Sequence, residues 1–256
     1  MKKLLLLILL SVGMTLSSMA TAPVAQTDSS STATASKSTS RFHTELSLAS
    51  RNVARGVSFG SSPSIQMLAS YNVCPYLELG TYGFATLNGN REGYGNQVNV
   101  YGKVKLNKEI SVTVDDYFFL ASNDNFNEWS TFSKDKTSHF IEARAKYDSR
   151  FDFTAAYTFF QNSAYGNNKA IYMEVGYDVT KDFNFFAGYI TDESPNNFYT
   201  DGGVTSVGGT VSTSLNKLHE GSVLKTSLIF APNHNNVVEA PGVGHAGIYL
   251  VATLNF

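Results

Sequence analysis

The hydrophobic pattern of this chain repeats every two residues from position 42 to the end, and this period constrains the fold more than any other feature. Side chains of a β-strand point alternately to its two faces, so a period of two predicts strands. Between residues 169 and 179, for example, Ile171, Val175 and Val179 lie on one face and Glu174 and Asp178 on the other. We predict twelve strands, at residues 42–54, 63–73, 75–87, 96–106, 109–120, 137–147, 151–161, 169–179, 182–191, 204–216, 222–230 and 246–256.

The connections between these strands alternate strictly between short and long. The short ones are residues 72–75, 107–108, 148–150, 180–181 and 216–221, and the long ones are residues 53–62, 88–95, 121–136, 161–168, 191–203 and 231–244. Most strands have about 9 to 13 residues, which is enough to cross a bilayer at a tilt. The sequence therefore predicts an all-β fold, an antiparallel transmembrane β-barrel of about 12 strands with short periplasmic turns and long extracellular loops.

Composition and side-chain placement agree with a barrel. Charged residues make up 16% of the chain and aromatic residues 13%. In the predicted strands at 137–147, 151–161 and 169–179 one face carries Glu142, Arg144, Lys146, Asp152, Glu174 and Asp178. We expect this face to line the lumen, while the apolar face meets lipid. Six aromatic residues on the apolar face lie near the short turns, where an interfacial girdle belongs. They are Tyr71, Tyr147, Phe151, Tyr177, Phe183 and Phe256.

The N-terminal segment predicts export. Lys2 and Lys3 precede an apolar run from Leu4 to Leu10, the pattern of a secretory signal peptide. We expect residues 1–22 to be a cleaved signal peptide, residues 23–41 a flexible leader rich in Ser, Thr and Ala, and residues 42–256 the barrel. An exported barrel belongs in the outer membrane of a Gram-negative cell. The net charge of −2 argues against a nucleic-acid partner, and the single Cys74 excludes an intramolecular disulfide.

The last predicted strand carries the most specific motif. Apolar residues alternate up to Phe256, at which the chain stops. A closing strand with a terminal aromatic residue resembles the signal that the bacterial barrel-assembly machinery recognises, with Tyr249, Leu254 and Phe256 as its candidate residues. The expected partners are this machinery, outer-membrane lipid and small hydrophilic solutes, and the sequence leaves the choice between a monomer and a homo-oligomer open.

A stretch at the end of the first predicted strand indicates which family of outer-membrane barrels the chain resembles. Residues 48–58 read Leu-Ala-Ser-Arg-Asn-Val-Ala-Arg-Gly-Val-Ser, and Pro63-Ser64-Ile65-Gln66 follow. This stretch resembles the opening of the TorF-type porins, which reads approximately Ser-x-x-x-x-Arg-Gly-x-Ser before Pro-x-Ile-Gln. In that family an aromatic residue usually stands just before Arg-Gly, where this chain has Val53 and Ala54. The resemblance implies a Gram-negative outer-membrane channel.

Charges on the inward strand face are the candidate pore lining. They are Glu45, Glu78, Lys103, Asp115, Glu142, Arg144, Glu174 and Lys225, to which Arg51 and Arg55 are added if the first strand continues past Ser50. We expect a salt bridge between Glu78 and Lys103, and a link from Glu142 and Arg144 to Asp115. The charges either line a weakly cation-selective pore or stiffen a filled lumen as ion pairs. Arg51 and Arg55 form a basic constriction at the outer mouth, or Arg55 holds a loop through hydrogen bonds to carbonyls.

Three functions follow from this pattern. The leading one is a porin-like channel for passive passage of small hydrophilic solutes or ions, which needs no catalytic residue, metal or cofactor. The alternative is a structural or surface-interaction barrel with a closed lumen, whose loops carry Trp129, Tyr165, Phe198 and Tyr199. The third is a membrane hydrolase. Residues 56–60 read Gly-x-Ser-x-Gly around Ser58, but this hydrolase motif needs a strand before it and a helix after it, and no helix is predicted here. His139, a candidate base, is on the same strand face as Ile141, which is expected to meet lipid. We therefore expect no enzyme.

Overall fold

The computed structural model describes residues 41–60, 63–87, 96–120, 129–163, 169–194, 197–217, 219–238 and 243–256. The signal peptide and almost all of the leader lie outside these residues. Among the described residues, no helix is long and apolar enough to cross a bilayer. The named helix η5 (His234–Asn236) is a single 3-10 turn in the last long loop.

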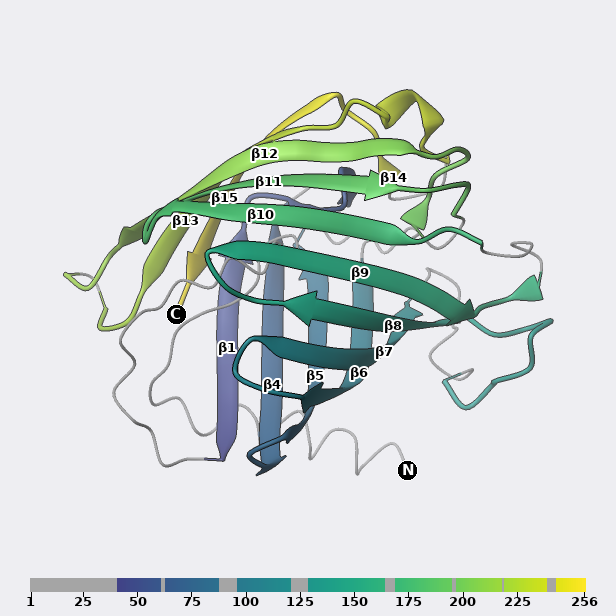
Figure 1. Ribbon diagram of the computed structural model, residues 1–256, viewed down its shortest axis with the longest axis horizontal. Helices are drawn as coiled ribbons and strands as arrows, with labels where there is room; N and C mark the ends of the chain where they lie inside the picture. Colours follow the sequence, from purple (N-terminus) through teal and green to yellow (C-terminus); the bar gives the residue numbers. More distant parts are fainter. Residues whose placement is uncertain are drawn as a thin grey trace.

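Twelve antiparallel strands form a closed barrel, as the alternating pattern predicts (Figure 1). They are β1 (Phe42–Ala49), β4 (Ser64–Cys74), β5 (Leu77–Thr86), β6 (Asn96–Lys105), β7 (Ile110–Phe119), β8 (His139–Tyr147), β9 (Phe151–Phe160), β10 (Tyr172–Thr180), β11 (Phe183–Ile190), β12 (Gly203–Ser214), β13 (Val223–Phe230) and β15 (Ile248–Asn255). The predicted alternation of short turns and long loops holds, so the barrel has a short-turn end and a long-loop end. The wall closes where β1 pairs with both β4 and β15.

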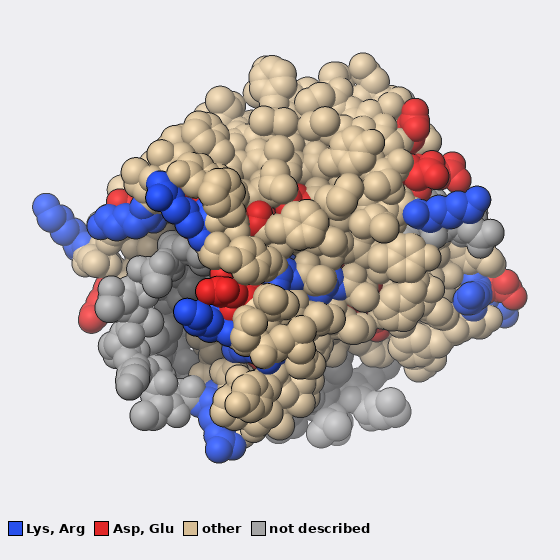
Figure 2. Space-filling model, in the orientation of Figure 1, with Lys and Arg blue, Asp and Glu red and all other residues tan. Residues whose placement is uncertain are grey.

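The two faces of the wall differ in chemistry, as the period of two requires. Large apolar side chains point outward and are exposed, among them Val175 at 52% and Phe151 at 66%. Polar and charged side chains point inward and are buried, among them Gln66, Asn99 and Glu142. Figure 2 shows one face, on which the upper part is free of charged side chains, whereas charged side chains lie at the left and right and between tan side chains in the middle. At the short-turn end, the rings of Phe151 and Tyr177 lie 4.6 Å apart, as expected for neighbours in an aromatic girdle.

The first strand is shorter than predicted, because the chain leaves the wall after Ala49. Residues 50–60 turn inward and form a hairpin from β2 (Asn52–Ala54) and β3 (Val57–Phe59). The short strand β14 (Val243–Gly244), from the last long loop, adds to β3. The prediction of one strand over residues 42–54 is therefore wrong. Alternation continues through Val53 because β2 is itself a strand, so the period of two gave no sign that the chain changes sheet.

Apolar side chains fill the long-loop end of the lumen. The outer-mouth cluster combines hairpin residues, inward-facing wall residues and loop residues. Its members are Val57, Phe59, Phe84, Phe119, Phe140, Ala170, Ile190, Phe198, Tyr199 and Val237. The rings of Phe59 and Phe119 stack at 6.1 Å, and Phe198 meets Phe59 edge-on at 5.5 Å. A second cluster joins Val53 to inward-facing residues of β11, β13 and β15, so both hairpin strands pack against the wall.

Candidate functional site

The tip of the inward hairpin is a two-residue turn with unusual backbone angles. Ala54 and Val57 pair across the hairpin, which leaves Arg55 and Gly56 between them with φ of 52° and 79°. Positive φ at both central residues is the geometry of a type I′ turn, whose twist suits a hairpin. Glycine adopts it freely, whereas an arginine there is strained. A Cβ atom on Gly56 would lie 2.0 Å from the carbonyl oxygen of Thr205, so the tip has room only for glycine.

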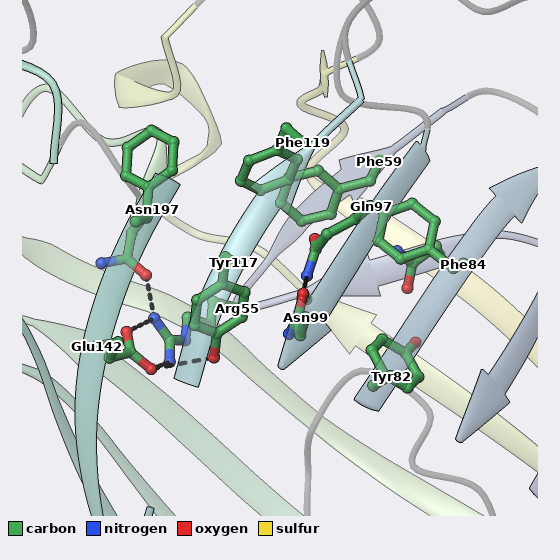
Figure 3. A pocket seen from close by; sticks show the side chains of 13 residues that line it. Arg55, Phe59, Tyr82, Phe84, Gln97, Asn99, Tyr117, Phe119, Glu142 and Asn197 are labelled. Atoms are coloured by element: carbon green, nitrogen blue, oxygen red, sulfur yellow. Dashed lines mark hydrogen bonds and ion pairs between the residues drawn. The ribbon is translucent and has the colours of Figure 1, made fainter. Parts of the chain in front are cut away.

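From this tip, Arg55 reaches the opposite wall of the lumen (Figure 3). Its Nη1 donates to Oε2 of Glu142 at 2.8 Å, and its Nη2 donates to Oε1 at 2.7 Å. Nη1 also donates to the side-chain oxygen of Asn197 in the β11–β12 loop. The guanidinium carbon lies 4.3 Å from the centre of the Tyr172 ring. Two parallel hydrogen bonds to one carboxylate fix both distance and orientation, so this contact pins the hairpin in the lumen.

The backbone of the tip is held as well. The Tyr199 hydroxyl donates to the carbonyl oxygen of Arg55 at 2.8 Å. Burial raises the pKa of this phenol above its ordinary value, so it remains a donor at neutral pH. Burial by itself would lower the pKa of Arg55, but the charge and hydrogen bonds of Glu142 outweigh it and raise that pKa. The Arg55 guanidinium therefore stays charged over the physiological pH range.

A small cavity of about 90 Å³ lies beside the ion pair, between the hairpin and the wall strands β5 to β8. Its lining is divided. Phe59, Phe84, Phe119 and Phe140 form an apolar side that is continuous with the outer-mouth cluster. The polar side is formed by Asn52, Arg55, Tyr82, Gln97, Asn99, Tyr117, Glu142 and Asn197 (Figure 3). At about 30 Å³ per water molecule, such a volume accommodates a few waters or a solute of a few heavy atoms.

The basic constriction predicted from Arg51 and Arg55 does not form. Arg51 lies 6.0 Å from the ring of Tyr249, and Arg55 is neutralised by Glu142. The alternative, in which Arg55 anchors a loop, is correct in its effect, but the partners are a carboxylate and an amide rather than carbonyls. The long-range partner Glu142 could not be read from sequence spacing, because it lies 87 residues from Arg55.

The predicted bridge between Glu78 and Lys103 is also wrong, although the two residues are directly opposite in the β5–β6 register. Glu78 pairs instead with Lys105 at 3.1 Å, and its other carboxyl oxygen accepts a hydrogen bond from Tyr101 at 2.9 Å. Long side chains reach diagonal partners across a sheet, so register alone does not select the lysine.

The other predicted pore-lining residues have partners within reach. Arg144 bridges Asp115 at 2.9 Å, as predicted, whereas Glu142, which was expected to join the same link, pairs with Arg55 instead. Glu45 lies 2.7 Å from His43, and the Tyr172 hydroxyl donates to Glu174 at 2.5 Å. Lys225 is buried on the inward face of β13. Arg144 with Asp115 and Arg55 with Glu142 form charge pairs between elements, whereas the contacts of Glu45 and Glu174 lie two residues away on the same strand.

Sequence reasoning missed Asn197, Tyr172 and Tyr199 as parts of the site. Asn197 and Tyr199 belong to a long loop, and their approach to Arg55 depends on how that loop folds inward. The expectation that Phe198 and Tyr199 serve outside contacts is wrong, because they are only 3% and 1% exposed in the outer-mouth cluster. Tyr165 lies outside the described residues. The sequence held one sign of the hairpin, the pair Arg55-Gly56 between apolar residues. Such a pair is typical of a two-residue hairpin turn.

The residues considered for hydrolysis do not form a catalytic arrangement with one another. Ser58 is buried on β3, and its hydroxyl donates to the Gly60 carbonyl at 3.1 Å. His139 has the predicted outward parity but is not lipid-facing, since it is 0% exposed beneath Trp129 and Phe132. Its ring nitrogens contact Asp116 at 2.9 Å and the Trp129 carbonyl at 2.8 Å. In the part of the chain that the structure describes, no group of three His, Cys, Asp or Glu side chains could hold a metal.

Comparisons with known proteins add little beyond architecture. No family model and no curated protein sequence matches the chain. Among solved structures it is similar to Wzi, an outer-membrane carbohydrate-binding β-barrel involved in group 1 capsule assembly in Escherichia coli, with 10% identity and a TM-score of 0.31 over 78% of this chain and 54% of Wzi. The chain thus spans about half the length of Wzi.

Two further solved structures are similar at the same level. LpxR from Salmonella typhimurium has 7% identity and a TM-score of 0.33 over 83% of this chain and 99% of LpxR. The outer-membrane protein OprD from Pseudomonas aeruginosa has 13% identity and a TM-score of 0.30 over 76% of this chain and 59% of OprD. Similarity this low carries no inference about function, which rests on the residues of this chain.

Proposed function

We propose that this protein is an outer-membrane channel for passive passage of small hydrophilic solutes or ions, and that the inward hairpin closes it. The membrane location is supported by the outward face of the barrel. A soluble protein rarely exposes contiguous apolar surface of this extent, whereas a lipid-embedded barrel requires it. The signal peptide expected at residues 1–22 and the resemblance to TorF-type porins favour the same location.

The observation that carries the channel proposal is the Arg55–Glu142 contact across the lumen. The hairpin is not part of the wall, because every wall strand has its neighbours without β2 and β3. A segment that crosses the lumen and leaves the wall intact is the arrangement expected of a constriction or gate. The wall strands pair with one another without the hairpin, so a barrel from which the hairpin is displaced would keep the pairing of its wall.

The closed-lumen barrel is the second candidate, and the outer-mouth cluster favours it. Three long loops contribute to this cluster, and the backbone of the β11–β12 loop is bonded to that of the β13–β15 loop. Val238 donates to the Phe198 carbonyl at 2.7 Å, and Thr200 donates to the Asn236 carbonyl at 2.8 Å. If these loops stay in place, no solute passes, and the exposed parts of the loops would carry the function.

Removal of the hairpin separates the two candidates. We would replace residues 52–59 by a Gly-Ser linker of equal length, refold both proteins, and record single-channel currents in planar bilayers. The channel proposal predicts rare or small steps from the wild type and frequent, larger steps from the variant. A silent variant that still migrates as a folded barrel on a detergent gel would instead support the closed lumen.

A further inference from the structure

The end of the β7–β8 loop lies against the outer surface of the wall. Phe118 and His139 are directly opposite in the β7–β8 register and point outward, yet each is 0% exposed. The ring of Trp129 meets that of Phe118 edge-on at 4.9 Å. The ring of Phe132 stacks on the imidazole of His139 at 4.4 Å. We call residues 129–137 the strap, because they cover this part of the outer wall.

The two ends of the strap are held differently. Near its C-terminal end, the backbone nitrogen of Ser163 donates to the Lys134 carbonyl at 2.7 Å, and the Ser163 hydroxyl donates to Asp135 at 2.9 Å. These bonds tie the strap to the start of the β9–β10 loop. At its other end, the Trp129 carbonyl oxygen lies 2.8 Å from Nε2 of His139 on the wall. His139 therefore supplies a polar contact that holds the beginning of the strap on the wall.

The contacts of His139 fix the number of protons that the closed strap must hold. A carbonyl oxygen only accepts hydrogen bonds, so Nε2 carries a hydrogen for Trp129. Nδ1 lies 2.9 Å from both carboxyl oxygens of Asp116. A neutral imidazole has only one N–H, so its Nδ1 would present a lone pair to an ionised carboxylate, which also only accepts. The closed arrangement therefore needs one further proton, placed on Nδ1 or on the Asp116 carboxyl group.

Among the described residues, no other charge replaces this proton. Strand β7 presents Asp116 and the ring of Phe118 to His139, and the strap presents two aromatic rings and a carbonyl oxygen. The charged residues of the strap, at 134–136, are exposed and form no ion pair with either member of the pair. The Asp116 side chain is 20% exposed, so the pair can exchange its proton with the surroundings. Loss of the proton leaves a buried lone pair against a carboxylate and removes a charge-assisted hydrogen bond.

We propose that His139 and Asp116 form a proton-dependent latch that holds the strap on the outer wall. The closed strap needs a proton that a separate neutral histidine and an ionised aspartate do not hold, so a low pH favours closure and a rising pH favours release. Release would uncover Phe118 and His139 at the long-loop end of the barrel. The residues that follow them in sequence, Phe119 and Phe140, line the cavity on the lumen side, so the latch lies next to the outer-mouth cluster. This inference concerns the outer wall and does not depend on the proposed channel function.

Amide hydrogen exchange of the strap, followed by mass spectrometry on the folded barrel in lipid vesicles, tests the latch. Peptides covering residues 129–138 would be compared from about pH 5, where a histidine is protonated, to about pH 9, where it is neutral, after correction for the base catalysis of exchange. We expect the fraction of open strap to rise about tenfold across this range, the ratio that one charge-assisted hydrogen bond produces. The emission of Trp129, the single tryptophan of the chain, gives a second record of the same step. Exchange that does not change with pH would overturn the proposal.

Two substitutions separate the latch from a merely structural contact. In Asp116→Asn, the side-chain amide donates to Nδ1 while the Nε2 hydrogen still serves the Trp129 carbonyl, so the strap stays closed without the extra proton. We expect this variant to remain protected at high pH, with the pH-dependent rise removed. His139→Gln has no titrating ring and should lose the pH dependence as well. His219→Gln, at an exposed histidine in the β12–β13 turn, is the matched control and should exchange as the wild type does. An unchanged pH dependence in either folded variant would overturn the latch, because another group would then titrate.

Discussion

At the scale of single residues, Arg55 links a strained turn to a buried charge. A non-glycine residue at φ of 52° costs conformational energy, and it is retained because its guanidinium meets Glu142, Asn197 and Tyr172. Gly56 beside it is required by the close Thr205 carbonyl. From sequence, Arg55 and Glu142 could each be placed on the inward side. Their contact could not, because it joins positions 87 residues apart through a chain reversal that the strand pattern does not record.

Substitution of Gly56 tests the fit of the hairpin tip. Gly56→Ala should destabilise the closed conformation by about 1 to 3 kcal/mol, because the new Cβ meets backbone and φ is positive. Urea unfolding from lipid vesicles, followed by Trp129 fluorescence, measures the change. Gly102→Ala is the control, since its Cβ would meet only Leu79 at an ordinary 3.5 Å. Equal unfolding midpoints for the two variants would show that the tip is not tightly packed.

The Arg55–Glu142 pair should behave as a coupled unit. Either Arg55→Met or Glu142→Gln should destabilise the protein by about 3 to 5 kcal/mol, because each leaves one buried charge without its partner. The double variant should be more stable than either single variant, since no uncompensated charge remains. Strictly additive losses in urea unfolding would contradict a direct buried contact.

At the scale of elements, the twelve wall strands follow from a purely local rule. A strand with one face against lipid and one against the lumen must alternate, so β10 and β15 could be located to within a few residues. The hairpin was not predicted because side chains in β2 and β3 also point alternately to two faces. Only the turn residues Arg55 and Gly56 depart from this strand pattern. The partner of Glu78 was predicted wrongly for a related reason. Register determines which backbone positions are neighbours, but the long side chains of Lys103 and Lys105 can both reach Glu78, so register does not decide which lysine pairs with it.

Substitutions at two depths on the outward face of β10 test whether this face of the barrel meets lipid. Val175 lies near the middle of the strand and Val179 next to the short turn, both on the outward face. Val175→Lys should destabilise the barrel by about 2 to 4 kcal/mol, because the charge is placed near the bilayer centre. Val179→Lys should cost about 0 to 1 kcal/mol at the interface. Equal costs in vesicle unfolding would show that this face does not meet lipid.

At the scale of the whole molecule, closure of the sheet explains why the chain needs no disulfide. Every wall strand is bonded on both sides, so the barrel leaves no complete edge strand. We therefore expect unheated samples to migrate differently from boiled samples on a detergent gel, with a strand-dominated circular dichroism spectrum. Identical migration together with a helical spectrum would contradict the barrel.

The central claim is that an intact barrel wall surrounds a lumen closed by the hairpin. Single-channel recording of the wild type beside the protein with residues 52–59 replaced by a linker tests it most directly. The account predicts few or small current steps before replacement and frequent, larger steps afterwards, with unchanged heat-dependent migration. Identical currents from the two folded proteins would contradict it, because the hairpin would then control nothing that passes through the barrel.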